Sequence, residues 1–197
     1  MKMRIPIILM VMVLYAMPMQ AASLKINLVP CGEVPPGLLS YLQDGIAKEL
    51  KAEVSQAGNA VPLPAGAYDP RRRQYRAEAF LPMLTNYRPG SNGLVLGVTG
   101  GDLFVPELNF VFGLAEPRQK SAIISLARLH PEFYGQPANQ HLFRERALKE
   151  AVHELGHLLG LGHCPNPACI MFFSNSLADT DRKGPGFCPR CRSLQKK

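Results

Sequence analysis

The sequence lacks the features that mark repeat proteins, low-complexity proteins and membrane-spanning proteins. It has no tryptophan, and charged residues make up only 19% of its 197 residues, against 47% hydrophobic residues. It contains no internal repeat and no low-complexity tract. Its longest apolar run lies near the start of the chain and is shorter than a membrane-spanning helix requires. These absences exclude a repeat protein and a stable membrane span in the mature chain, and the length predicts one domain.

Acidic residues are also in short supply. The chain has 15 Asp and Glu residues against 22 Lys and Arg residues, which gives a formal net charge of +7. Part of the positive charge lies in the arginine run 71–73 together with Arg76. An acidic partner is one interpretation of that run, but we favour a solvated face at the start of a helix. No nucleic-acid-binding motif accompanies the charge, so we expect no nucleic-acid partner.

The first 22 residues have the pattern of a signal peptide. Lys2 and Arg4 provide a positive start, residues 5–19 are apolar apart from two prolines, and small side chains close the segment. This pattern predicts that residues 1–22 are removed and that the protein is exported, to a periplasm or out of the cell.

The mature chain is then a single domain over residues 23–197. A cytoplasmic protein that starts at Met17 or Met19 is the alternative to export. Either start would remove no predicted strand or helix, because the first strand begins near Leu24.

The pattern of apolar residues predicts strands alternating with helices. The run LVLGVT at 94–99 is the most strand-like and is expected at the centre of the sheet. Turn residues near 116–120 predict that the last two strands are antiparallel. This order predicts an α/β (α+β) fold with a mixed, twisted sheet backed by helices. The expected strands are 24–29, 52–54, 94–99, 108–114 and 122–126, and the expected helices are 37–50, 69–84 and 140–159.

Three of the five histidines lie in one run that begins at His153 and ends at His163. His153 and His157 are four residues apart, so on a helix both imidazoles project from one face and can bind a single Zn²⁺. Glu154 lies beside the first histidine, where its carboxylate can reach a water on the metal. Gly160 allows the helix to end in a left-handed conformation, and the turn brings back His163 as a third ligand. Three protein ligands leave one position open, as a catalytic zinc requires.

Four of the five cysteines follow this run, as the pairs Cys164/Cys169 and Cys188/Cys191. They could form two disulfides, a redox-active Cys-x-x-Cys, or a closed tetrahedral zinc site. Two close pairs separated by a loop favour zinc. We therefore predict a structural zinc-binding segment over residues 164–191, which makes two zinc ions per chain. Cys31 has no partner in this scheme and is expected to be a free thiol.

The motif from His153 to His163 with a nearby methionine resembles the metzincin zinc peptidases. Its continuation through the four cysteines is similar to the archaemetzincins. The resemblance extends over roughly residues 24–193, and further stretches that carry it are 74–75, 96–102, 109–113, 125–129 and 172–177.

The resemblance implies that Met171 is the turn methionine, packed beneath the three histidines. It also implies that the strand near 123–126 is a sheet edge to which an extended peptide backbone pairs.

These observations predict a zinc metallopeptidase, a hydrolase that acts as a monomer on peptides or proteins, with Glu154 as the general base. The alternative from a different class is a zinc-loaded binding or structural protein with little or no hydrolytic activity. A chance arrangement of two structural histidines and an unrelated third is disfavoured by Gly160 and by the spacing of the cysteines.

Overall fold

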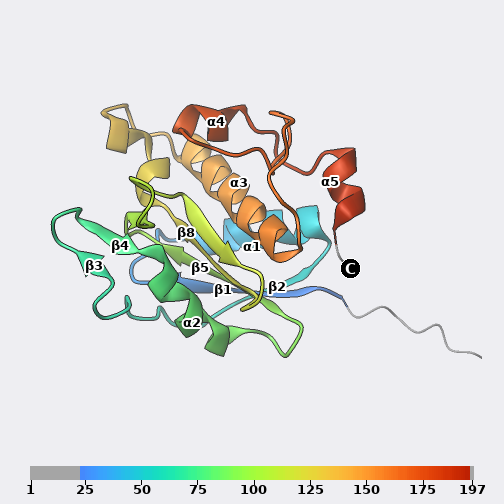
Figure 1. The fold of residues 1–197 in the computed structure, drawn as a ribbon, viewed down its shortest axis with the longest axis horizontal. Coiled ribbons are helices and arrows are strands. Elements are labelled where there is room, and N and C mark those ends of the chain that lie inside the picture. Colours follow the sequence, from blue (N-terminus) through green and yellow to red (C-terminus); the bar gives the residue numbers. More distant parts are fainter. Residues whose placement is uncertain (1–22, 196–197) are drawn as a thin grey trace, which may run out of the picture.

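A computed structural model describes residues 23–195, so the predicted signal peptide lies outside the described residues. Its main feature is a five-stranded sheet with the order β2-β1-β5-β8-β7 (Figure 1). The first four strands in this order are parallel, and β7 is antiparallel to β8, which confirms the mixed sheet and the central place of β5. The strands are β1 (Lys25–Cys31), β2 (Glu53–Gln56), β5 (Leu94–Thr99), β7 (Gly113–Glu116) and β8 (Ser121–Ser125).

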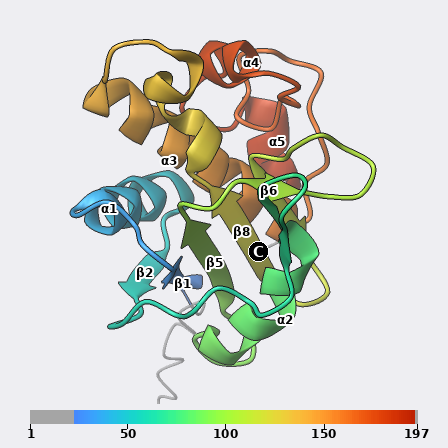
Figure 2. The ribbon, with the colours of Figure 1, turned by 90° about the vertical axis from the view of Figure 1, so that its left-hand side faces the viewer.

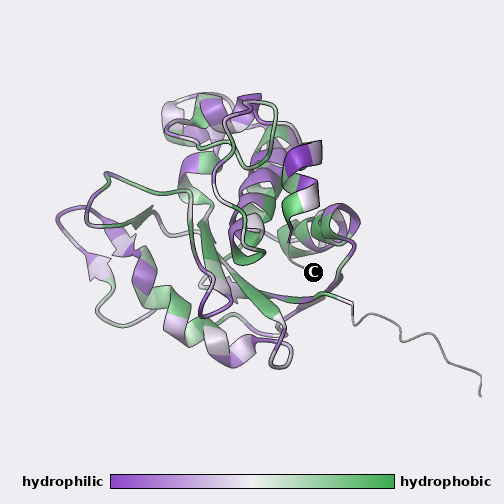
Figure 3. Ribbon diagram, turned by 45° about the vertical axis from the view of Figure 1, so that its right-hand side comes forward, coloured by the Kyte–Doolittle hydropathy of each residue, from purple (hydrophilic) through white to green (hydrophobic). Residues whose placement is uncertain are grey.

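Helices cover both faces of this sheet. α1 (Leu38–Leu50) and α3 (Gln140–Leu158) lie on one face, and the short α2 (Phe80–Leu84) lies on the other (Figure 2). Alternate residues of β5 supply the two cores, because neighbouring side chains of a strand point to opposite faces. Leu96 packs with the α1 and α3 side, and Val95 packs with the α2 side. The apolar residues accordingly concentrate in the central strands and on the inward faces of the helices (Figure 3).

The predicted helix over 69–84 is wrong in its first half. Its beginning is instead a small sheet with the order β3-β4-β6, in which β3 (Tyr68–Asp69) and β4 (Gln74–Arg76) form a tight hairpin and β6 (Leu103–Phe104) adds a third strand. The Asp69 carboxylate accepts hydrogen bonds from the backbone N–H groups of residues 71 and 72, and Arg73 has a left-handed φ of 57°. These contacts favour a turn over a helix start, so the arginine run lies at the tip of a hairpin.

Two predictions about the last strands also need correction. The predicted strand 108–114 begins only at Gly113, and the residues before it form an irregular segment. The strand near 123–126 is not a sheet edge, because β8 lies between β5 and β7 and is hydrogen-bonded to both. The edge on this side of the described sheet is β7. A strand's neighbours depend on pairing with distant segments and could not be deduced from residues 121–125 alone.

The C-terminal region lies beside α3 and carries two short helices, α4 (Leu177–Arg182) and α5 (Pro189–Leu194) (Figure 1). α4 begins with a capping box in which Ser176 and Asp179 satisfy each other's backbone N–H groups. In the part of the chain that the structure describes, no helix combines the length and apolarity needed to cross a membrane. Short 3₁₀ helices occupy Ala77–Ala79 (η1), Thr85–Tyr87 (η2), Ala127–Leu129 (η3) and Pro131–Tyr134 (η4).

Candidate metal centre

The last turns of α3 position the first part of the site. His153, Glu154 and His157 all lie on this helix, which ends at Leu158. Gly160 has a φ of 86°, and the N–H of Leu161 donates to the carbonyl of Gly156 at 3.0 Å. This is the left-handed ending that the sequence predicts. It turns the chain sharply, so that His163 returns toward the two helical histidines.

The structure brings the three imidazoles together. One ligand nitrogen from each lies within 4.8 Å of the others, and the Nε2 atoms of His153 and His157 are 3.1 Å apart. The Nδ1 atom of His153 lies 2.8 Å from the Ile170 carbonyl, and that of His157 lies 2.8 Å from the Leu161 carbonyl. A carbonyl only accepts, so each Nδ1 carries the hydrogen in the neutral ring. Both Nε2 lone pairs therefore face one another.

Two facing lone pairs repel each other unless a cation lies between them. Two nitrogens at the usual zinc–nitrogen distance and a tetrahedral angle are about 3.3 Å apart, close to the spacing of the two helical histidines. The donor set thus fits a zinc ion. Burial lowers the pKa of all three histidines, most strongly that of His153, where the nearby Lys183 cation acts in the same direction. Neutral imidazole is the form that ligates metal.

Glu154 is buried beside these histidines, with 6% of its surface exposed. Burial, followed by the charge of Glu150, raises its pKa to about 8. Its carboxylate packs directly against the edge strand, because a Cβ added at Gly113 would lie 2.6 Å from Glu154 Oε1. Only glycine at position 113 leaves space for the Glu154 carboxylate, so any side chain at this position of β7 would displace the glutamate.

A pocket of about 610 Å³ opens in front of these residues. Glu154 and the three histidines line one part of it, and β7 lines another. Members of the irregular segment 105–112, which we call the pocket wall, also line it. Phe173 also lines it and lies against the His163 ring, with ring centroids 4.6 Å apart. The arrangement gives a peptide-sized cleft with a metal-binding set and a buried carboxylate along it.

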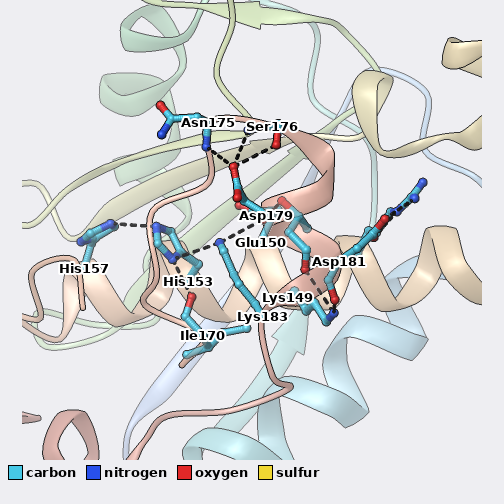
Figure 4. A network of polar contacts seen from close by, with 12 residues as sticks. Lys149, Glu150, His153, His157, Ile170, Asn175, Ser176, Asp179, Asp181 and Lys183 are labelled. Carbon is cyan, nitrogen blue, oxygen red and sulfur yellow. Dashed lines mark hydrogen bonds and ion pairs between the residues drawn. The ribbon is translucent and has the colours of Figure 1, made fainter. Parts of the chain in front are cut away.

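A buried ion pair behind the site could not be identified from the sequence. Lys183 Nζ donates to Glu150 Oε1 at 3.2 Å, and the side chains are 0% and 3% exposed (Figure 4). Thr180 Oγ1 donates to the same oxygen at 2.9 Å. The ammonium group lies 3.4 Å from His153 Nδ1 (Figure 4). Glu150 is one turn before Glu154 on α3, which is a local signal, but Lys183 is 33 residues further along the chain.

The four C-terminal cysteines form a second cluster. Their sulfur atoms lie within 4.8 Å of one another, and Cys164 Sγ is 3.9 Å from Cys188 Sγ. Two thiolates on a tetrahedral zinc are about 3.8 Å apart, so this donor set also fits zinc. The backbone N–H of Cys191 lowers the pKa of Cys188 to about 7, which favours its thiolate. Burial raises the pKa of Cys169 and Cys191, so metal binding there must displace their protons. All five cysteines of the described chain are free, and Cys31 is a buried thiol with its pKa raised by burial to about 12.

Met171 is fully buried and contacts residues that belong to or adjoin both clusters. Its sulfur occupies the space that a side chain at Gly156 would fill, since a Cβ there would lie 2.4 Å from the sulfur. Its carbonyl accepts from the N–H of Cys164 at 2.8 Å. Met171 therefore packs against α3 at Gly156, the residue before His157. Its carbonyl also fixes the backbone of Cys164.

Comparisons with known proteins agree with this geometry. The model of peptidase family M54 matches residues 51–197. An archaemetzincin from Pyrococcus abyssi is 48% identical over 181 residues, which cover 87% of this chain and 94% of that protein.

Two solved structures superpose closely on this fold. A zinc-dependent peptidase from Methanocorpusculum labreanum matches with a TM-score of 0.79 and 36% identity, covering 86% of this chain and 98% of that one. An archaemetzincin from Methanopyrus kandleri matches with a TM-score of 0.77 and 39% identity, covering 90% and 96%. The family model and the curated relative together show that this chain belongs to peptidase family M54, the archaemetzincins.

Proposed function

We propose that this protein is a zinc-dependent metallopeptidase that hydrolyses peptide bonds, with His153, His157 and His163 as the ligands of the catalytic zinc. The observation that carries the proposal is the 3.1 Å separation of the Nε2 atoms of His153 and His157, whose rings are each fixed by a backbone carbonyl at Nδ1. Family membership supports the reaction class. A zinc ion bound there supplies Lewis acidity, which activates water and polarises the scissile carbonyl.

Glu154 has the chemistry of a general base and acid. Its carboxylate takes a proton from the attacking water and delivers that proton to the nitrogen of the leaving amine. Burial raises its pKa to about 8, so the protonated and ionised forms are close in free energy near neutral pH. Lys183 opposes this rise and keeps the ionised form accessible.

The edge strand β7 is placed to hold the substrate. Gly113 and Leu114 line the pocket, and on its inner side β7 pairs with β8. The outer backbone groups of an edge strand are free to pair with an extended peptide. We therefore assign to β7 the substrate-pairing role that the sequence resemblance had placed on residues 123–126.

The test of the reaction uses the zinc-loaded protein and its Glu154→Ala variant on a broad peptide library. We expect the wild type to cleave peptides and the variant to lose about 10²–10⁴-fold in kcat with zinc still bound. Hydrolysis that persists unchanged in the variant would exclude Glu154 as the base. A zinc-loaded wild type that binds peptides without cleaving them would favour a binding protein.

The four cysteines are proposed to hold a second, structural zinc. Cys164, Cys169 and Cys191 are buried, and four sulfur ligands leave no position for water. Metal analysis of the pure protein should give two zinc ions per chain. A disulfide within the cluster would contradict this assignment.

Export through a signal peptide at residues 1–22 remains a proposal. Its support is the sequence pattern of a positive start, an apolar stretch and small side chains just before Ser23. The N-terminal residue of the protein isolated from its own cells tests it. Ser23 or a neighbour supports export, and Met17 or Met19 supports a cytoplasmic start.

A further inference from the structure

The pocket wall, residues 105–112, has little backbone support of its own. Residues 105–110 belong to no helix or strand. The far end is tied to the sheets, because Val111 N–H donates to the Leu103 carbonyl and the Phe112 carbonyl accepts from Ser125 N–H. The stretch before it needs other partners, since backbone groups without partners are costly to bury.

Two side chains from the β3–β4 hairpin provide them. Gln74 is buried, with 3% of its surface exposed, and its Nε2 donates to the Asn109 carbonyl and to Asp102 Oδ2, both at 3.0 Å. Its Oε1 accepts from Arg72 Nε at 3.0 Å, so all of its polar groups are used. Arg72 Nη2 donates to the carbonyls of Leu108 at 2.7 Å and of Asn109 at 3.1 Å.

A second pair ties these contacts to the segments that follow β5 and β8. Arg128 makes two hydrogen bonds of 2.8 Å to the carboxylate of Asp102, in the bidentate geometry that arginine favours. The guanidinium of Arg128 also lies over the rings of Phe110, at 4.3 Å, and Phe133, at 4.9 Å. Phe110 lines the pocket. Arg72, Gln74, Asp102 and Arg128 thus form one connected clamp on the wall.

We propose that this clamp positions the pocket wall and thereby makes the site selective for peptides with a bulky apolar side chain. The side chains that the wall adds to the pocket are mainly apolar: Val105, Leu108, Phe110, Val111 and Phe112. Burying a leucine against such a surface favours binding, whereas a polar side chain of similar size gains no such burial. The inference rests on the proposed function only in taking a peptide as the ligand of this pocket.

The test measures peptide binding, which does not require hydrolysis. The zinc-loaded Glu154→Ala protein is titrated with two fluorescein-labelled peptides, Ala-Ala-Gly-Leu-Ala-Ala and its counterpart with asparagine in place of leucine. With the clamp intact, we expect the leucine peptide to bind about ten-fold more tightly. Adding Gln74→Ala or Arg72→Met should reduce this preference to less than about three-fold without changing the zinc content.

The neighbouring arginine provides the matched control. Arg71 is exposed and its side chain makes none of the clamp contacts, so Arg71→Met removes the same charge and should keep the preference. Arg72→Lys keeps the charge but loses the forked geometry, and should retain part of it. If Gln74→Ala fails to fold, Gln74→Met removes the same donor at similar volume, and Arg72→Met changes only an exposed side chain.

Hydrogen exchange locates the effect. Amides of residues 107–110 should exchange faster in the clamp variants, with α3 unchanged. Three results would overturn the proposal. The leucine preference could be absent when the clamp is intact, it could survive both Gln74→Ala and Arg72→Met, or it could fall equally in Arg71→Met. Retained selectivity in a protein that never cleaves peptides would refute the proposed reaction and leave this inference standing.

Discussion

The histidine and cysteine clusters differ in what surrounds them, although Cys164 directly follows His163 in the chain. Two of the histidines lie on a long helix and have carbonyls that fix their tautomers, and all three line a pocket. The cysteines lie on short turns and a short helix, and none of them lines that pocket. The histidine cluster resembles an open metal site whose ligands are positioned by the surrounding fold. The cysteine cluster resembles a closed metal site in which the metal itself would hold the short segments together.

Both clusters are tied to the same segment of chain. Ile170 accepts the hydrogen bond from His153, and the next residue, Met171, accepts from the N–H of Cys164. Metal binding at the cysteines should therefore order the groups that orient the histidines. We therefore expect the two sites to have separate chemical roles, but we expect loss of zinc at the cysteines to weaken zinc binding at the histidines.

The largest effect is expected from Cys188→Ser. Loss of one thiolate should abolish zinc binding at the cysteines and lower the free energy of unfolding, because metal binding there contributes directly to folding. Zinc affinity at the histidines should also fall, by about ten-fold or more. Metal analysis with competing chelators and urea unfolding measure both. The control is Cys31→Ala, which removes a buried thiol outside the cluster and should leave two zinc ions bound. Zinc bound at the histidines as tightly as before would refute the coupling.

A change confined to the open site is Lys183→Met. It leaves the buried Glu150 carboxylate without its cation, which should cost about 3–5 kcal/mol of unfolding free energy. The double variant Lys183→Met/Glu150→Gln removes both charges and should recover most of this loss. Zinc at the cysteines should stay bound in both proteins. Equal destabilisation of the single and double variants would show that the ion pair is not the cause.

Gly113→Ala tests how closely the edge strand holds the base. The added Cβ would lie 2.6 Å from Glu154 Oε1, so the carboxylate must move. Displacement of a reacting group by about 1 Å can cost about 100-fold in rate. We expect kcat to fall by about that factor with two zinc ions still bound. Ala115→Val, on the same face of the same strand, is the control for packing. Full activity in Gly113→Ala would mean that the glutamate is not held by β7.

The smallest effect is expected at the far side of the closed site. Glu49 on α1 accepts hydrogen bonds from Phe187 N–H at 3.3 Å and from Arg192 Nη2 at 2.7 Å, and so ties the tail to the main fold. Glu49→Gln should cost about 0.5–1 kcal/mol, because the pair is partly exposed. It should weaken zinc at the cysteines slightly and leave the histidine site unchanged. A larger loss at the histidines than at the cysteines would reverse the comparison.

The sequence predicted the features that depend mainly on neighbouring residues in the chain. The turn that brings His163 back depends on Gly160, because glycine adopts a left-handed φ without help from distant residues. The central place of β5 followed from its continuous apolar run, because strands covered on both faces need one.

Features that depend on distant partners were mispredicted or missed. The helix expected from residue 69 was replaced by a hairpin, where the Asp69 side chain competes for the backbone N–H groups. β8 was expected at an edge that β7 occupies. The pair of Glu150 with Lys183 joins two elements that only the folded chain brings together.

We propose that an open, catalytic zinc at the histidines and a closed, structural zinc at the cysteines lie side by side in this chain. Stepwise removal of zinc by a chelator, followed by metal content, peptide hydrolysis and thermal unfolding on one sample, tests it most directly. The wild type should start with two zinc ions per chain. Loss of the first should abolish hydrolysis while the fold persists, and loss of the second should sharply lower the unfolding temperature. A chain that binds only one zinc, or hydrolysis that survives the loss of the first, would contradict it.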